Sequence, residues 1–195
     1  MYELPTYVEV NGVQFNIRLK GDYRMVLDCF KALNDAEISE DERVLASLLI
    51  FYNEFDELED LPRDQETMQA LIIGMFNFMN CGEEETLGAQ SDYTIIDWDK
   101  DERMVASAIN KVACQEIRAV KYMHWWTFMG YFMAVGESVL ATVIGIRSKI
   151  AKGEKLEKWE QKFKKDNPSY FIWRNIDLRV AQQKALLDEV WNRGE

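Results

Sequence analysis

The chain has 195 residues, which is enough for one domain, or for two small lobes, with a sizeable core. Hydrophobic residues make up 48% of it and charged residues 29%, a composition typical of folded, soluble proteins and not of disordered ones. The formal net charge of −11 argues against nucleic acid as a partner of the whole chain, because phosphates would repel it. The first residues lack the basic start and apolar run of a signal peptide, so we expect the protein to stay where it is made.

The charge is unevenly distributed along the chain. Residues 1–101 hold 23 acidic and 7 basic side chains, a net charge of −16, whereas residues 102–195 hold 11 acidic and 16 basic ones, a net charge of +5. The two halves should attract each other, either within one molecule or head to tail between copies, and the charges alone leave both arrangements open. Either contact should weaken as salt is added.

The first element predicted is a β-hairpin. Asn11-Gly12 lies between two alternating runs, over residues 7–10 and 13–18, and supplies the positive φ angles of a type I′ turn. A two-stranded hairpin alone is marginal in water. We therefore expect it to pack on helices or to offer its spare edge to another chain.

Helical periodicity begins at Asp22 and continues through the N-terminal half. Ser39 and Glu42 have the spacing of a capping box, which predicts the start of a second helix. Pro62 interrupts an acidic stretch ahead of a third helix, and Cys81-Gly82 ends that helix. The apolar stripe of the third helix comprises Leu71, Ile72, Met75, Phe76 and Met79.

An acidic linker is predicted after this helix. The sequence thus divides into a hairpin and helical lobe over residues 1–82, a linker over 83–98 and a C-terminal helical lobe over 99–195; one compact domain is the alternative. The second part of the linker carries apolar residues that predict docking onto the fold, namely Tyr93, Ile95, Ile96 and Trp98.

The second half predicts helices over about 100–118, 119–135, 137–151 and 152–166. In the last of them, a buried stripe at i, i+3 and i+7 is expected for Leu156, Trp159 and Phe163. A further helical stripe in the tail comprises Trp173, Ile176, Val180, Leu187 and Trp191. The fold class predicted is mainly α, with about six to seven helices and an N-terminal β-hairpin.

The stretch 122–136 is rich in aromatic residues and methionine. Its fifteen uncharged residues are too few for a membrane span, which needs about 20. A central core helix is the favoured interpretation, because buried helices are apolar nearly all round. The alternative is a surface that binds another protein, since Trp, Tyr and Met are enriched in interfaces. The residues of this surface would be Trp125, Trp126, Phe128, Met129 and Phe132.

No catalytic, cofactor-binding or metal-binding constellation is present in the sequence, and we expect no enzyme. His124 is the only histidine, so a zinc site that needs two histidines cannot form. The sequence also has no GxSxG motif, whose serine could form a catalytic triad with His124. A structural role is expected for it. The cysteines, Cys29, Cys81 and Cys114, are odd in number and lack CxxC spacing, so we expect reduced, mostly buried thiols.

The segment 147–165 carries eight basic and three acidic side chains. It could bind an acidic partner or the acidic half of the chain, with Lys155, Lys158 and Lys162 as contact residues. The alternative is a nucleic-acid-binding or packaging-associated role. That role would use Arg147, Lys149, Lys152, Lys155, Lys158, Trp159 and Lys162.

Four stretches resemble, in this order, the small phage proteins known as gene product fifteen: YTIIDWDKDERMVASAI, KYMHWWTFMGYFMAV, VLATVIGIRSK and KLEKWEQKFKKDNPSYF. The most specific marks are His124-Trp125-Trp126 followed by Phe128, and Ile146-Arg147. The resemblance covers roughly residues 90–170. Between residues 109 and 119 this chain departs from the family pattern, because it has NKVACQEIRAV in place of an aromatic-rich turn.

The resemblance implies a protein without enzymatic activity. Members are encoded near the tape-measure gene of long-tailed phages and prophages of Gram-positive bacteria, and are grouped with tail assembly chaperones. The implied partners are the tape-measure protein and the tail-tube protein, and several copies would coat the tape-measure protein. The implied place of action is the host bacterial cytoplasm, with no copy in the mature virion. The apolar segment, the high net charge and the spare hairpin edge are compatible with such a role.

Overall fold

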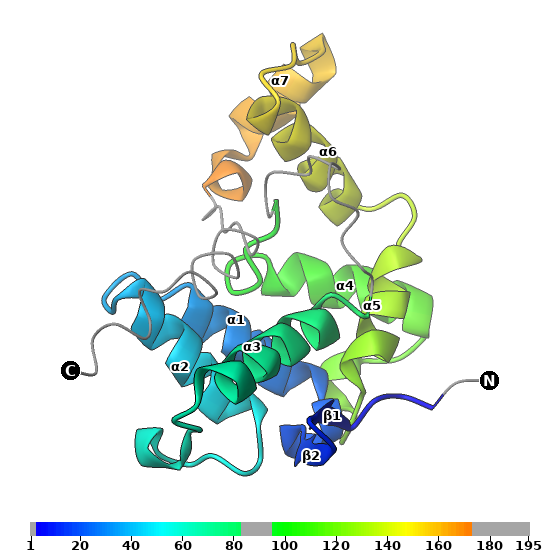
Figure 1. The fold of residues 1–195 in the computed structure, drawn as a ribbon. Helices are drawn as coiled ribbons and strands as arrows, with labels where there is room; N and C mark the ends of the chain where they lie inside the picture. Colours follow the sequence, from blue (N-terminus) through cyan, green and yellow to red (C-terminus); the bar gives the residue numbers. More distant parts are fainter. Residues whose placement is uncertain (1–2, 83–94, 173–195) are drawn as a thin grey trace. The chain divides into compact units, whose positions relative to one another are not determined.

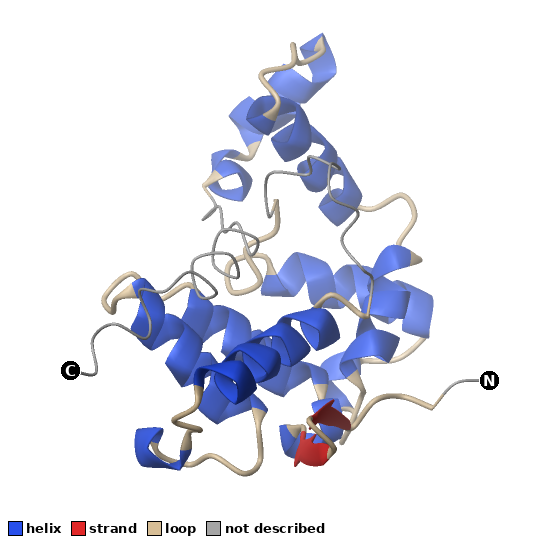
Figure 2. Ribbon diagram, in the orientation of Figure 1, coloured by secondary structure: helices blue, strands red, loops and turns tan. Residues whose placement is uncertain are grey.

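The computed structural model of the chain describes residues 3–82 and 95–172. These residues divide into two compact units, of which the first holds residues 3–82 and 122–129 and the second holds residues 95–121 and 130–172. Seven α-helices and one two-stranded hairpin make up the regular structure of this part of the chain, apart from short 3-10 turns (Figure 1, Figure 2). The mainly α fold with an N-terminal hairpin is thereby confirmed. Tyr93 and the helical stripe predicted for the tail lie outside the described residues.

The hairpin forms where the sequence predicts it. Strand β1 (Tyr7–Val10) pairs antiparallel with strand β2 (Val13–Asn16). Asn11 and Gly12 have φ angles of 52° and 79°, so both central turn positions adopt the left-handed geometry of a type I′ turn.

The outer edge of β2 is partly covered by the chain itself. Ile17 forms an isolated bridge with Tyr52, so the strand ends before the predicted residue 18. Asn53 donates its backbone N–H to the carbonyl of Asn16, and the carboxylate of Glu54 accepts from the backbone N–H of Asn16. The backbone groups of Asn16 on this edge are therefore already hydrogen-bonded within the chain and are not available to pair with another strand.

Three helices form the body of the first unit: α1 (Tyr23–Leu33), α2 (Glu40–Phe51) and α3 (Gln65–Met79). Helix α2 packs against both α1 and α3, and β1 packs against α3 (Figure 1). The stripe predicted for α3 is buried in full, which confirms that α3 presents it to the core: Leu71, Ile72, Met75, Phe76 and Met79.

The start of α2 and the end of α3 follow the predicted local signals. Ser39 and Glu42 form the capping box, in which the Glu42 carboxylate accepts from the Ser39 N–H at 2.8 Å. Asp22 caps α1, and Asp64 caps α3 by accepting from a backbone N–H of the first turn. Cys81, with a φ angle of 58°, turns the chain out of α3 as predicted.

In the second unit, helix α4 (Glu102–Ala113) is shorter than the helix predicted over 100–118. Cys114 adopts a left-handed conformation with a φ angle of 53° and ends it. The chain then forms a separate 3-10 turn over Ile117–Ala119. Cys114 is exposed, so the prediction of mostly buried thiols is wrong for this cysteine and right for Cys29.

Helix α5 (Trp125–Met133) begins six residues later than the predicted helix over 119–135. The difference has a tertiary cause within the first unit. The residues before α5 are extended, because His124 forms a bridge with Asp22 and the Met123 carbonyl accepts from the backbone N–H of Tyr23 at 2.9 Å. Backbone pairing with a distant segment here outweighs helical periodicity.

Helix α6 (Val139–Ala151) starts at the cap residue Ser138 and confirms the predicted helix over 137–151. Helix α7 (Lys158–Asp166) covers only the second part of the helix predicted over 152–166. Gly153, with a φ angle of 69°, breaks the helical path, and a capping box of Glu157 with Glu160 starts α7 anew.

Candidate protein-binding surfaces

Trp125 and Phe128 lie in the core of the first unit, each only 1% exposed. The indole N–H of Trp125 donates to the carbonyl of Met79 at 2.8 Å. The Phe128 ring stacks on Trp125 and on Tyr23, with centroid separations of 5.5 and 4.6 Å. These two residues of the predicted partner-binding set thus build the core of the first unit and are not accessible to a partner.

Trp126 and Met129 are half-buried in the same unit. The indole N–H of Trp126 donates to the carbonyl of Phe78 at 2.9 Å. Gly82 follows α3 with a φ angle of 72°, and a Cβ at this position would lie 3.0 Å from the Trp126 ring. Trp126 therefore covers the C-terminal end of α3 and keeps part of its surface exposed.

His124 is a buried structural group. Its Nδ1 accepts from the backbone N–H of Trp126 at 3.1 Å, so its Nε2 carries the proton and donates to the carbonyl of Pro5 at 3.0 Å. Burial lowers the pKa of His124. The ring ties the N-terminal segment to the start of α5 and leaves no nitrogen for a metal or for a substrate.

The second unit contains the C-terminal part of α5. Phe132 is half-buried against Trp98, with a centroid separation of 5.5 Å. The end of the predicted linker thus packs onto the fold through Trp98, as expected. Met133 is 68% exposed and is the most solvent-accessible apolar side chain of the aromatic segment.

Arg147 belongs to the interior of the second unit and not to a basic surface. It is 1% exposed and pairs with the buried carboxylate of Asp101, with 2.9 Å between Nη2 and Oδ1. Its guanidinium also donates to the carbonyls of Ile95 and Tyr170 at 2.8 Å. The prediction that Arg147 contacts phosphates is therefore wrong, because its donors are directed into the protein.

The packing of α7 also differs from its predicted stripe. Glu160 is 3% exposed and accepts from the ammonium of Lys149 at 2.7 Å. Trp159 is 54% exposed, and its indole N–H donates to the carboxylate of Glu157. The buried side of α7 thus holds an ion pair where Trp159 was expected, and Lys149 is drawn away from the predicted nucleic-acid-binding set.

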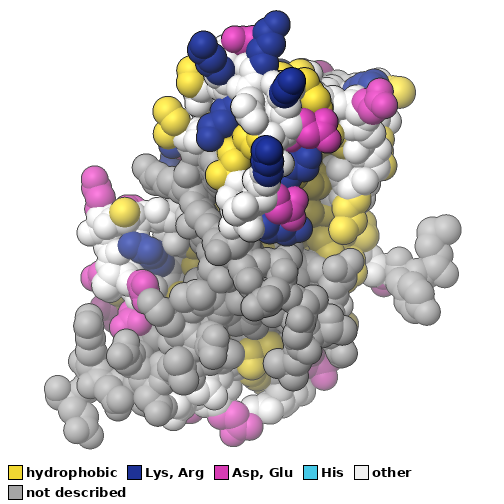
Figure 3. Space-filling view, turned by 90° about the horizontal axis from the view of Figure 1, so that it is seen from above, with side chains coloured by type: hydrophobic (Ala, Val, Ile, Leu, Met, Phe, Trp, Pro, Cys, Tyr) yellow, Lys and Arg dark blue, Asp and Glu magenta, His cyan; other side chains and the backbone are white. Residues whose placement is uncertain are grey.

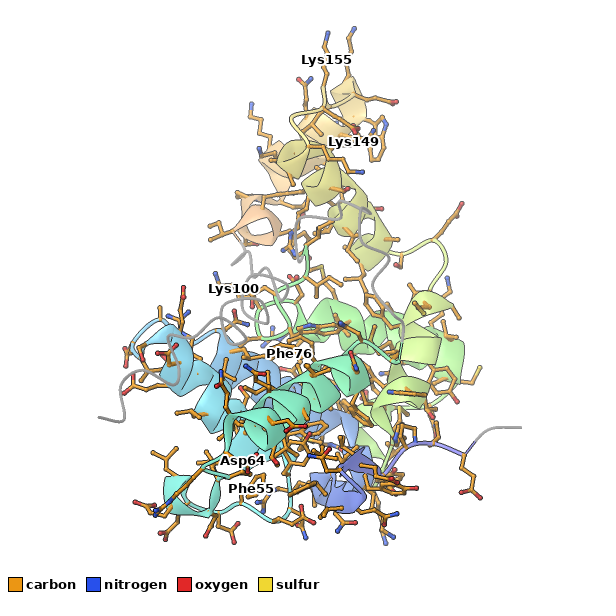
Figure 4. All side chains as sticks on the ribbon, viewed as in Figure 1. Phe55, Asp64, Phe76, Lys100, Lys149 and Lys155 are labelled. Carbon is orange, nitrogen blue, oxygen red and sulfur yellow. The ribbon has the colours of Figure 1, made fainter. Side chains whose placement is uncertain are left out.

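The predicted contact residues Lys155, Lys158 and Lys162 are all exposed. Figure 3 shows lysine and arginine side chains gathered on the second unit. In Figure 4, Lys155 points away from the helices, whereas Lys149 lies beside them. Lys158 and Lys162 are one helical turn apart on α7 and face the same way.

An exposed acidic loop joins α2 to α3 in the first unit. We define the acidic loop as residues 54–66, which include the first two residues of α3 and contain seven acidic side chains and one basic one, Arg63. Leu58 at its centre is 56% exposed. Sequence reasoning did not single out Leu58, although an apolar residue flanked on both sides by Glu57 and Glu59 is a signal of surface exposure.

Within the described residues, no group of three or more His, Cys, Asp or Glu side chains is arranged to hold a metal ion. Among the helices over residues 3–82 and 95–172, none is long and apolar enough to cross a membrane. What stands out is a set of exposed apolar side chains among charged ones.

The family profile described as Bacteriophage Gp15 protein matches residues 1–170, so the chain belongs to this family. The match extends the resemblance, which the sequence motifs place over residues 90–170, through the whole N-terminal half. Residues 171–195 lie beyond it. No curated protein and no solved structure gives a significant match.

Proposed function

We propose that the protein is a tail assembly chaperone of a long-tailed phage or prophage of Gram-positive bacteria, which binds the tape-measure protein and promotes tail morphogenesis. The observation that carries this proposal is membership of the bacteriophage Gp15 protein family over residues 1–170. In this role the protein acts by binding and not by catalysis. It works in the host bacterial cytoplasm, recruits the tail-tube protein as a second partner and is absent from the mature virion.

The surface chemistry supports this proposal. A chaperone for a long helical partner needs apolar side chains that can dock, and it needs charge that keeps the complex soluble. Met133 and Trp159 in the second unit and Leu58 in the first are each more than half exposed. The formal net charge of −11 supplies solubility.

The proposal is tested by co-expressing the chain with the tape-measure protein encoded beside it. We expect the tape-measure protein to stay soluble and to co-purify, whereas alone it aggregates. Replacing Met133 with Ser should lower the co-purified amount. Ala134→Ser, at the next exposed position, removes no large apolar side chain and should leave the co-purified amount unchanged. Equal solubility of the tape-measure protein with and without the chain would contradict the proposal.

Nucleic-acid binding is the rival function, and the exposed lysines of α7 are the observation in its favour. Arg147 and Lys149, however, are held by Asp101 and Glu160 and cannot contribute to it without breaking these ion pairs. Retention on immobilised DNA or RNA that falls steeply with salt would support the rival. Failure of the protein to bind either immobilised DNA or immobilised RNA at low salt would exclude nucleic-acid binding.

A further inference from the structure

One face of α7 carries a lysine stripe, which we define as Lys158, Lys162 and Lys165. Positions i, i+4 and i+7 lie on the same face of a helix, and all three side chains are exposed. None of them forms an ion pair with a described residue. Trp159, half-exposed, lies on the helix surface beside Lys162.

The lysine stripe and the acidic loop are complementary in two ways. The loop contributes a net charge of −6 over residues 54–66, opposite in sign to the stripe. Each also presents one large apolar side chain, Leu58 in the loop and Trp159 beside the stripe, with exposed fractions of 56% and 54%. An apolar anchor within a charged rim is the usual composition of a specific protein interface.

We propose that the lysine stripe of one copy of the chain docks onto the acidic loop of a second copy, with Trp159 against Leu58 of the partner copy. Charge complementarity identifies the occupant, because this chain itself carries a surface of each sign. The stripe and the loop are different surfaces, so the contact is heterologous, and a pair of copies still has one unused surface on each copy. Copies therefore add head to tail into a ring or an open series. The contact requires only this chain and does not rest on the proposed function.

Two charge-changed variants of the full chain test the contact by sedimentation at low salt. The stripe variant is Lys158→Glu/Lys162→Glu/Lys165→Glu, and the loop variant is Glu59→Lys/Glu66→Lys, all at exposed positions. The first reverses the charge of the stripe, and the second lowers the net charge of the acidic loop from −6 to −2 and places a lysine next to Leu58. Each variant alone should sediment as a monomer of about 22.9 kDa. Mixed in equal amounts, they should form a dimer and nothing larger, because each variant retains one functional surface. The unmodified chain should form larger species that grow with concentration and dissociate as salt is raised.

The matched control for the stripe variant is Lys31→Glu/Arg103→Glu/Lys121→Glu, which lowers the net charge by the same six units at exposed positions outside both surfaces. It should leave the assembly intact. Circular dichroism should show unchanged helix content in all variants, because no substituted side chain is buried. For the apolar anchor, Trp159→Ala should weaken association roughly tenfold, whereas Met133→Ala, at a more exposed position of the same unit, should not.

Three results would overturn the proposal. A monomeric unmodified chain at high concentration and low salt would mean that the opposite charges are satisfied within one molecule. A mixture of the two variants that stays monomeric would mean that these are the wrong surfaces. Loss of assembly in the matched control would mean that net charge alone governs association. None of these results bears on tape-measure binding, which is measured with the tape-measure protein present.

Discussion

Arg147 and Asp101 form a buried ion pair in the second unit. The pair joins α6 to the start of α4, and the same guanidinium binds the carbonyls of Ile95 and Tyr170. Both side chains are at most 2% exposed. Removing one partner of such a pair leaves an uncompensated charge in the interior, which is far more costly than removing both.

We expect Arg147→Met to lower the free energy of unfolding of the second unit by about 3–5 kcal/mol. The measurement is urea unfolding followed by circular dichroism. Arg118→Met is the matched control, because Arg118 pairs with Glu116 at a similar distance on the surface; it should cost less than about 1 kcal/mol. Adding Asp101→Leu to Arg147→Met should restore part of the loss. Equal losses from Arg147→Met and Arg118→Met would contradict the importance of burial.

Acidification should destabilise the first unit through His124. Burial holds the pKa of His124 below its usual 6.5, so the unfolded chain binds a proton more readily than the folded one. The contribution of His124 to stability is full above pH 6.5 and declines as the pH falls towards the lowered pKa, by at most about 1.4 kcal/mol per pH unit. Unfolding measured between pH 7.5 and 5.5 should show this slope. His124→Gln should flatten it, and an unchanged slope in this variant would assign the effect to other groups.

Gly74 is the contact point of α3 with the hairpin. A Cβ at Gly74 would lie 2.4 Å from Cγ1 of Val8, so Gly74→Ala has to push β1 away from the helix. We expect a loss of about 1–3 kcal/mol in the free energy of unfolding, measured by urea unfolding. Val8→Ala in the Gly74→Ala background should recover part of the loss. Gly145→Ala in α6, where a Cβ meets nothing within 4 Å, should instead stabilise the protein by roughly 0.5–1 kcal/mol.

Leu19 adopts the left-handed conformation that only glycine tolerates well, with a φ angle of 51°, and its side chain is 65% exposed. The strain of about 1–2 kcal/mol is only partly offset by burial of the side chain. Leu19→Gly should therefore raise the free energy of unfolding by about 0.5–1 kcal/mol, despite the greater entropy of glycine in the unfolded chain. Thermal unfolding measures the change. Leu58→Gly, at an exposed position outside this conformation, should lower stability, and a loss in both variants would show that Leu19 makes contacts that matter.

Local signals in the sequence determined the elements whose geometry depends on near neighbours. Asn11-Gly12 specifies the hairpin turn because few other residue pairs adopt two positive φ angles. Ser39 and Glu42 specify the start of α2 because the partner groups lie three residues apart. The buried stripe of α3 was predictable because its apolar residues recur with the period of a helix. The phage family was also readable from the HWW-centred motifs, although the match reaches further towards the N-terminus than those motifs do.

The division of the aromatic segment between core and surface was decided by tertiary structure. Trp125 packs on Phe30 and Phe128 in the core, and the carbonyl of Met79, 46 residues away in the sequence, accepts from its indole N–H. Met133, on the same short helix, remains exposed. A helical period shows which side chains share a face, but it does not show how far along the helix the core extends.

Which charged side chains are buried was also decided by the tertiary structure. Arg147 appears in the sequence as one member of a basic run, and its partner Asp101 lies 46 residues earlier within an acidic one. The burial of Glu160 in place of the expected Trp159 has the same origin, because Glu160 pairs with Lys149 on α6. Burial of a charge requires a partner brought close by folding, and a linear sequence does not indicate which of many carboxylates will supply it.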